Sequence, residues 1–422
     1  MTNEKHFGVP PRRRVPASPS RLKFLRPILH RASFVFPITR PPIEDGAVLV
    51  AEGVIEDVGP FRLLRRQWPS AQVCEHQDGA LLPALVNAHT HLDLSGLAGK
   101  VPAQGGMAQW IRRLLAAKER MNGLQLELAH QRALTSMRSF GTGIVADINS
   151  SARFAERIVE GTPITRTFLE VLGLQTDSLE QALNRFPERA QQILADGQEE
   201  ISLSAHAPYT TSAALLREVK AWSGVREKTV PVHVAESEEE IMFLQSGRGP
   251  LRDLLEERGL EPDRWSPPGC GPVTYLDRLG CLDRRTLCIH AVKVSKEEIE
   301  LLSRTEAGVC LCPRSNLFLG HGLPPVGRFL DAGVSCGLGT DSLASNDDLN
   351  LFNEMAVLVE RCGIDPETVL SMATLHGARN LGLVQRYGSL EKGKRWLAIR
   401  VGATDGESIV AAGCRGEVEW VT

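Results

Sequence analysis

The chain has 422 residues, of which 42% are hydrophobic and 23% are charged. This ordinary globular balance excludes a wholly disordered, collagen-like or coiled-coil protein. Its 48 basic and 51 acidic residues give a formal net charge of −3, which argues against a general nucleic-acid binder, because such proteins carry a basic excess. No apolar run approaches the roughly 18–20 residues of a membrane-spanning helix, so no membrane association is expected.

The N-terminal segment differs in charge from the rest. Residues 1–40 hold nine Lys and Arg but one acid, Glu4, and residues 10–20 are rich in Pro, Arg and Ser. This composition predicts a flexible basic tail over residues 1–23. A secretory signal is not expected, because Arg26 and Pro27 interrupt the apolar stretch that would follow the basic part. The nine cysteines are scattered without a C-x-x-C pair, which favours free thiols in a reducing, cytoplasmic setting.

Strand and helix patterns alternate along the remaining chain. Strand signals at 33–38, 46–52 and 54–58 are followed by a turn-rich segment that leads to Leu81. Eight short apolar runs come next, at 82–91, 142–149, 163–172, 201–207, 230–236, 286–292, 307–313 and 333–341. Helical patterns lie between them, among others at 107–121, 212–222, 296–304 and 349–361.

Continuous apolar runs are expected for parallel strands that are buried on both faces. Eight of them, separated by helices, predict an α/β fold with a (β/α)8 TIM barrel over residues 81–385. Further β-like runs at 396–401 and 408–411 close the chain. We therefore expect residues 24–80 and 386–422 to form a small β-sandwich domain from both chain ends.

Histidines and acids occur at or near the C-terminal ends of these apolar runs. They are His89 and His91 in the first, His206 in the fourth, His233 and Glu236 in the fifth, His290 in the sixth and Asp341 in the eighth. The C-terminal ends of barrel strands meet at one mouth, where catalytic groups are placed. Alternate residues of a strand face the same side, so His89 and His91 can both point at one ion.

Imidazoles and a carboxylate together favour a divalent metal ion, Zn²⁺ first and Fe²⁺ as the alternative. Three histidines and Asp341 would complete the protein ligands and leave one position for water, whose pKa falls to about 7 on such an ion. A single strand histidine is more often a hydrogen-bonded core residue, so the joint placement carries this prediction. For His206, a supporting, substrate-facing or packing role stays open.

Six segments carry a resemblance to a known family. They are Asn87–Leu92 (NAHTHL), Ala205–Thr210 (AHAPYT), His233–Glu236 (HVAE), Ile289–His290, Cys312–Asn316 (CPRSN) and Gly339–Asn346 (GTDSLASN). In order and spacing they resemble the amidohydrolase superfamily across residues 24–400. The resemblance is to the branch that holds the cytosine, guanine and adenosylhomocysteine/methylthioadenosine deaminases and the chlorohydrolases.

The resemblance implies a metal-dependent hydrolase that removes a ring-borne amine as ammonia. It implies that His89, His91, His233 and Asp341 bind the metal and that His206 touches the substrate. Glu236 would shuttle a proton to the ring nitrogen beside the attacked carbon, and His290 would help Asp341 to deprotonate the nucleophilic water. Members with two metals carry a bridging lysine on the fourth strand, and residues 201–209 contain no Lys, so one ion is expected.

The substrate is indicated by the residues after His91. The run Leu92–Ser95 (LDLS) resembles the aminodeoxyfutalosine deaminases of menaquinone biosynthesis, which act on an adenine-type nucleoside. The alternatives are methylthioadenosine, adenosylhomocysteine, guanine, cytosine or a chlorinated triazine, and, from another class, a metal-free scaffold protein.

Three further residues are candidates for substrate contact, namely Asp93, Arg314 and Ser345. Asp93 could instead cap a helix. Arg314 could meet a substrate carboxylate through a bidentate contact, or pair with a protein acid. We expect a small, purine nucleoside-like partner, and a homo-oligomer stays open.

Overall fold

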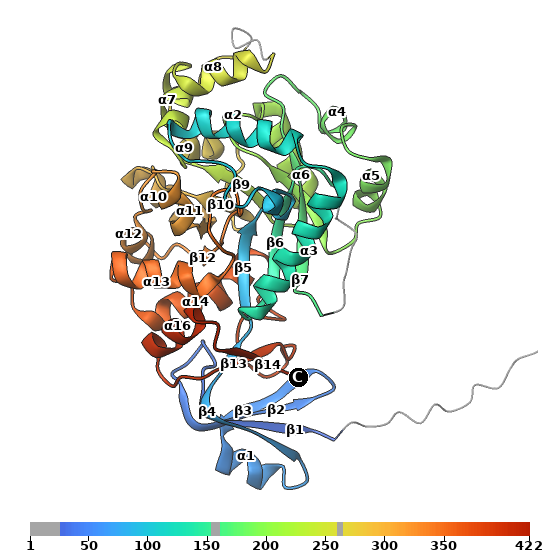
Figure 1. Cartoon of the computed structure of the whole chain (residues 1–422), viewed down its shortest axis with the longest axis vertical. Coiled ribbons are helices and arrows are strands. Elements are labelled where there is room, and N and C mark those ends of the chain that lie inside the picture. The colour runs from blue at the N-terminus through green and yellow to red at the C-terminus, as the bar shows by residue number, and fades with distance from the viewer. Residues whose placement is uncertain (1–25, 153–160, 260–264) are drawn as a thin grey trace, which may run out of the picture.

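The computed structural model describes residues 26–152, 161–259 and 265–422 (Figure 1). The basic segment 1–23 lies outside the described residues. None of the described helices combines the length and apolarity that a membrane span requires.

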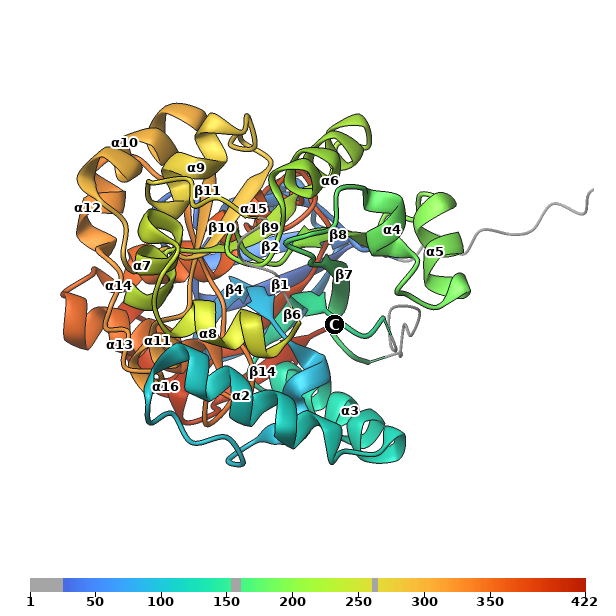
Figure 2. The ribbon, with the colours of Figure 1, turned by 90° about the horizontal axis from the view of Figure 1, so that it is seen from above.

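A ring of parallel strands forms the centre of the described chain, and helices surround it (Figure 2). The eight described barrel strands are β5 (Leu85–Thr90), β6 (Thr142–Asn149), β7 (Ile164–Val171), β8 (Ile201–Ala205), β9 (Val230–Val234), β10 (Thr286–His290), β11 (Gly308–Leu311) and β12 (Cys336–Leu338). They are hydrogen-bonded as two half-barrels, β5–β8 and β9–β12. Backbone bonds from His233 N to His206 O (2.9 Å) and from Asp341 N to His89 O (3.1 Å) join the halves. The predicted (β/α)8 barrel is confirmed.

The helices around the barrel begin at polar caps. The Ser212 side chain accepts a hydrogen bond from Leu215 N, and Ser295 forms a reciprocal capping box with Glu298, which satisfies the first free N–H groups of each helix. The longer helices are α2 (Gly106–Glu119), α3 (Gly123–Ser139), α5 (Glu188–Ala195), α6 (Ala213–Val225), α7 (Glu238–Ser246), α8 (Pro250–Glu257), α10 (Lys296–Thr305) and α13 (Leu351–Cys362). The shorter ones are η1 (Leu92–Leu97), α4 (Leu179–Leu183), α9 (Pro272–Arg278), α11 (Pro313–Phe318), α12 (Val326–Asp331), α14 (Pro366–Ser371), the π-helical turn η3 (Met372–His376) and α15 (Gly377–Asn380).

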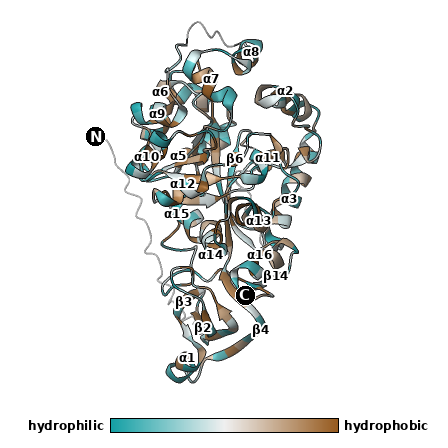
Figure 3. Ribbon diagram, turned by 90° about the vertical axis from the view of Figure 1, so that its left-hand side faces the viewer, coloured by the Kyte–Doolittle hydropathy of each residue, from teal (hydrophilic) through white to brown (hydrophobic). Residues whose placement is uncertain are grey.

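Strands from both chain ends form a second, smaller sheet below the barrel in Figure 1. Its described strands are β14 (Val418–Val421), β13 (Ala398–Val401), β4 (Gln72–Pro83), β1 (Ile28–Val35), β2 (Ile43–Ala51) and β3 (Val54–Pro60), in that spatial order. Helix α1 (Phe61–Gln67) places Leu64 against Leu29 and Leu49 on one face. Figure 3 shows hydrophobic residues along the strands and many hydrophilic residues on the outer helices.

Two segments differ from the sequence prediction. Residues 408–411 were predicted as strand and instead lie in α16 (Gly406–Cys414), because the Asp405 side chain accepts from Ser408 N and starts a helix there. Their Ile-Val pair favours a strand locally, but the cap and the tertiary packing decide. The turn-rich segment before Leu81 contains most of β4, which pairs with β1 across a register shift.

Candidate metal centre and its cavity

The C-terminal ends of the barrel strands bring distant residues together. His89, His91 and His233 offer three nitrogen atoms that all lie within 4.8 Å of one another, and His89, His290 and Asp341 form a second such group. Four non-glycine residues at these ends, Ala235, His290, Ala291 and Asp341, have positive φ values of 50°, 71°, 49° and 56°. Such left-handed backbone is costly for residues with a side chain and is concentrated at functional sites.

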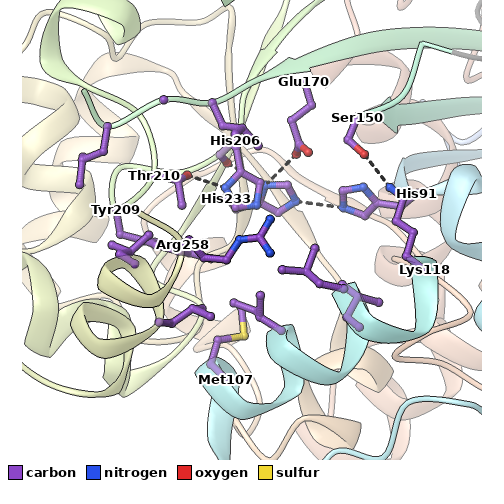
Figure 4. Close-up of a pocket in the computed structure, with 18 of the residues that line it drawn as sticks. His91, Met107, Lys118, Ser150, Glu170, His206, Tyr209, Thr210, His233 and Arg258 are labelled. Carbon is purple, nitrogen blue, oxygen red and sulfur yellow. Dashed lines mark hydrogen bonds and ion pairs between the residues drawn. The ribbon is translucent and has the colours of Figure 1, made fainter. Parts of the chain in front are cut away.

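His91 and His233 face each other across this cluster. Their Nε2 atoms are 3.2 Å apart, and Figure 4 marks this contact. The Nδ1 of His91 lies 3.0 Å from Ile148 O, and that of His233 lies 2.7 Å from His206 O. A carbonyl only accepts, so each Nδ1 carries the proton and each Nε2 presents a lone pair to the other. Two facing lone pairs require a cation, and a divalent metal ion fits them.

His89 and Asp341 complete the donor set. His89 is fully buried, and neither of its ring nitrogens has a hydrogen-bond partner among the described residues. Its Nε2 is 3.4 Å from Asp341 Oδ1, and His91 Nε2 is 3.8 Å from the same oxygen. Burial lowers the pKa of His89. Burial alone would raise the pKa of Asp341, but contact with His89 and the neighbouring histidines holds it well below its usual value. Neutral imidazoles and an ionised carboxylate are the forms that bind metal.

Glu236 lies beside this donor set with its own partners. Its Oε1 is 3.7 Å from His290 Nε2 and 3.9 Å from His321 Nε2. Burial, then the charges of Asp341 and Glu240, raise the pKa of Glu236 well above its usual value. Burial lowers the pKa of His290 to about 3. The surroundings therefore favour the protonated form of the Glu236 carboxyl and the neutral form of the His290 imidazole.

Two of the predicted substrate contacts have other partners. Ser345 is fully buried, and its Oγ lies 3.0 Å from Asp341 Oδ2, which also accepts from Ser315 Oγ at 2.6 Å. Arg314 Nη1 forms an ion pair with Asp348 at 2.7 Å. Neither Arg314 nor Ser345 is among the residues that line the cavity at the barrel mouth. Arg314 and Ser345 therefore have partners within the protein, and their contact with the substrate stays a prediction.

A cavity of about 660 Å³ opens above the cluster. His91, His233, Glu236, His290 and Asp341 lie among its lining residues. Apolar side chains of α2 and α8 form one wall, including those of Met107, Trp110, Leu114, Leu254 and Leu255. The cavity is therefore polar at the strand ends and apolar along these helices.

His206 and Asp93 also line this cavity. His206 Nδ1 is 2.6 Å from Thr210 Oγ1. Asp93 Oδ2 accepts from Lys118 Nζ and from Ser150 Oγ, both at 2.9 Å. The Oδ1 atom of Asp93 is buried without a hydrogen-bond partner in the described chain. Asp93 thus presents a free acceptor near the cavity.

Arg258 is a lining residue that no sequence motif indicated. It follows α8, and Figure 4 shows its guanidinium pointing into the cavity toward the imidazoles. It is exposed and forms no ion pair with any described residue.

Glu170 is a second cavity residue that the sequence analysis missed. It lies near the C-terminal end of β7, so the same placement at a strand end that indicated the histidines applies to it. Its Oε1 lies 3.8 Å from His233 Nδ1.

Comparison with known proteins gives consistent matches. Residues 80–419 match the model of the amidohydrolase family. A 5-methylthioadenosine/S-adenosylhomocysteine deaminase of Desulforudis audaxviator is 30% identical over an alignment of 393 residues, and the match covers 87% of this chain and 83% of the relative. An aminodeoxyfutalosine deaminase of Deinococcus radiodurans is 30% identical over an alignment of 381 residues, and the match covers 83% of this chain and 86% of the relative. The crystal structure of an adenosine deaminase from Xanthomonas campestris with bound zinc is 26% identical, covers 93% of this chain and 90% of that one, and has a TM-score of 0.72.

Proposed function

Because the chain belongs to the amidohydrolase family, we propose that it is a hydrolase that holds one divalent metal ion and deaminates an adenine-type nucleoside. The observation that carries this proposal is the pair of facing Nε2 lone pairs of His91 and His233, 3.2 Å apart, beside the buried acid Glu236. Relatives of this chain are named as deaminases of adenine nucleosides, and one related structure holds zinc. Zn²⁺ is therefore the first candidate and Fe²⁺ the second.

The metal ligands in this proposal are His89, His91, His233 and Asp341. When bound, the ion supplies Lewis-acid activation of a water molecule. Ser315 and Ser345 hold Asp341 through its other oxygen, Oδ2, which leaves Oδ1 for the ion. The carbonyls that accept from His91 and His233 keep their Nε2 atoms turned toward it.

Glu236 and His290 move protons in this proposal. The Glu236 carboxyl, protonated because its pKa is raised, gives its proton to the ring nitrogen beside the carbon under attack. His290, together with Asp341, takes a proton from the attacking water. A proton then returns to the exocyclic amine, which leaves as ammonia, and the ring keeps the oxygen.

We propose aminodeoxyfutalosine as the substrate. This adenine nucleoside carries an aromatic ring with a carboxylate on its 5′ side, so it offers an apolar surface and a negative charge. The apolar wall of α2 and α8 suits the ring, and the guanidinium of Arg258 suits the carboxylate. The free Oδ1 of Asp93 suits a sugar hydroxyl. Methylthioadenosine, which has no carboxylate, is the main alternative.

A screen of ammonia release tests this proposal. Purified protein loaded with zinc is assayed with aminodeoxyfutalosine, methylthioadenosine, adenosylhomocysteine, adenosine, guanine and cytosine. We expect the highest kcat/KM for aminodeoxyfutalosine. Equal or faster turnover of methylthioadenosine would mean that methylthioadenosine is the substrate, while the proposed deamination would stand. Absence of ammonia with all of these amines would contradict the proposal that the protein is a deaminase.

We also propose a reducing, cytoplasmic compartment for the enzyme. All nine cysteines lie in the described part of the chain, and each is a free thiol.

The competing functional class is a metal-free scaffold protein. Metal analysis of gently purified protein distinguishes the enzyme from the scaffold. One ion in the barrel favours the enzyme, and none favours the scaffold.

A further inference from the structure

The small sheet contains a second group of metal-ligand side chains, outside the barrel. His30 lies on β1, and Cys74 and His76 lie on the neighbouring strand β4. The two strands are parallel, and His30 is the register partner of Cys74. Alternate residues of a strand face the same side, so Cys74 and His76 both point to the side of His30. One donor atom from each of the three lies within 4.8 Å of the others.

The rings of His30 and His76 are stacked in a geometry similar to that of the facing pair in the barrel, although Nδ1 of one ring here contacts Nε2 of the other. His30 Nδ1 is 3.0 Å from His76 Nε2, with ring centroids 5.3 Å apart and an interplanar angle of 17°. For His91 and His233 the Nε2 atoms are 3.2 Å apart, the centroids 5.3 Å and the angle 9°. A third donor lies close to the pair in both places.

The surroundings hold the imidazole of His30 in place and leave Cys74 and His76 accessible to solvent. His30 is 1% exposed, and Trp396 stacks on its ring at a centroid distance of 4.7 Å. Cys74 and His76 are only half-buried, so an ion can reach the group from solvent. Ligand positions that are held before binding reduce the cost of binding.

We propose that His30, Cys74 and His76 form a second metal site, which takes Zn²⁺ or a divalent ion of similar softness. Two imidazoles and a thiolate are a characteristic zinc donor set, and water would take the fourth position. The Cys74 thiol would release its proton to solvent when the ion binds. The ion would tie β1 to β4, the strand that leads directly into β5 of the barrel, and it would take no part in the chemistry at the barrel mouth.

Cobalt titration tests the site, because a thiolate bound to Co²⁺ gives a near-ultraviolet charge-transfer band. None of the proposed barrel ligands is a cysteine, so this band reports only on the small sheet. Chelator-treated full-length protein should bind two equivalents of Co²⁺ and show the band. Cys74→Ser should remove the band and one equivalent. Cys362→Ser, a half-buried cysteine at the end of α13, should change neither.

Two further variants keep the test decisive. His76→Gln removes a half-buried ligand and should also abolish the band, while His91→Ala, in the barrel, should keep it. The band therefore tests this site even if the proposed deaminase activity fails. Wild-type protein that binds one equivalent without the band, or a band that survives Cys74→Ser, would overturn the proposal and leave His30 and His76 as a hydrogen-bonded pair.

Discussion

The pKa values of two acids at the floor of the cavity, Asp341 and Glu236, are shifted in opposite directions by their surroundings. Burial would raise the pKa of Asp341, but its contact with His89 and the nearby histidines lower it well below the usual value. Burial and the charge of Asp341 raise the pKa of Glu236 well above the usual value. Where surroundings shift the pKa values of two neighbouring acids in opposite directions, the two acids usually have different catalytic roles. Here Asp341 suits a metal ligand and Glu236 a proton donor.

Substitution of Glu236 separates these roles. Glu236→Gln keeps the size of the side chain but removes its acidic proton. We expect metal content to stay unchanged and kcat to fall by about 10²–10⁴, the usual contribution of a general acid. Glu238→Gln, at an exposed acid two residues later, should keep wild-type kcat. Unchanged turnover in Glu236→Gln would show that Glu236 does not transfer the proton.

His206 is expected to act on the substrate and not on the metal. Its ring lines the cavity, and its Nδ1 is engaged by Thr210. His206→Ala should therefore leave the metal content intact while it raises KM or lowers kcat. Loss of the metal on this substitution, measured by elemental analysis, would show that His206 is a metal ligand.

Arg258 is expected to set the preference for a charged substrate. A charge-assisted hydrogen bond contributes about 1.5–3 kcal/mol, so Arg258→Gln should raise KM for aminodeoxyfutalosine by roughly 10- to 100-fold. Turnover of adenosine, which has no carboxylate, should change little. Arg252→Gln is the control, because Arg252 lies on α8, the helix that Arg258 follows, and pairs with Glu256. A similar loss for both nucleosides would exclude a role for Arg258 in reading the carboxylate.

At the scale of elements, the first turn of α7 contains a buried acid of its own. Glu240 is fully buried, and its Oε2 accepts from Glu236 N at 2.8 Å. Burial, the largest cause, raises the pKa of Glu240 to about 8 from 4.5. The folded state thus holds this proton more tightly than the unfolded state does. Its contribution to stability is fully present below pH 4.5 and is lost as the pH rises toward 8.

Glu240→Gln should remove this pH dependence. We expect the Tm of the variant, relative to wild type, to rise steadily between pH 5 and pH 8, and Glu238→Gln to show no such trend. Thermal unfolding at several pH values measures this. A difference in Tm that stays constant across the range would show that Glu240 does not change its protonation there.

The barrel strands and the helices between them were predictable because their sequence patterns are local. Buried parallel strands such as β6 and β10 are continuous apolar runs, and the caps Ser212 and Ser295 mark helix starts in the sequence. Residues 408–411 were mispredicted because Ile409 and Val410 favour strands, whereas the helical state depends on the cap at Asp405 and on packing. Most of β4 was missed because its pairing with β1 is a long-range contact that no local pattern reveals.

At the scale of the whole molecule, the candidate metal ligands come from both half-barrels. His89 and His91 belong to the end of β5, whereas His233 belongs to β9 and Asp341 follows β12. Barrel topology predicts that these ends converge, which is why the sequence indicated the cluster. The partners of Arg314 and Ser345 and the direction of Arg258 depend on side-chain packing, so a position on a strand end or loop could not reveal them.

In the proposed reaction, deamination requires the metal ion at the barrel mouth. The most direct measurement is ammonia release from aminodeoxyfutalosine by the full-length protein, before and after removal of metal with a chelator, and after zinc is added back. We predict that chelation abolishes release, that zinc restores it in the wild type, and that zinc fails to restore it in His91→Ala. Ammonia release that continues unchanged in metal-free protein would show that the metal ion is not needed for deamination.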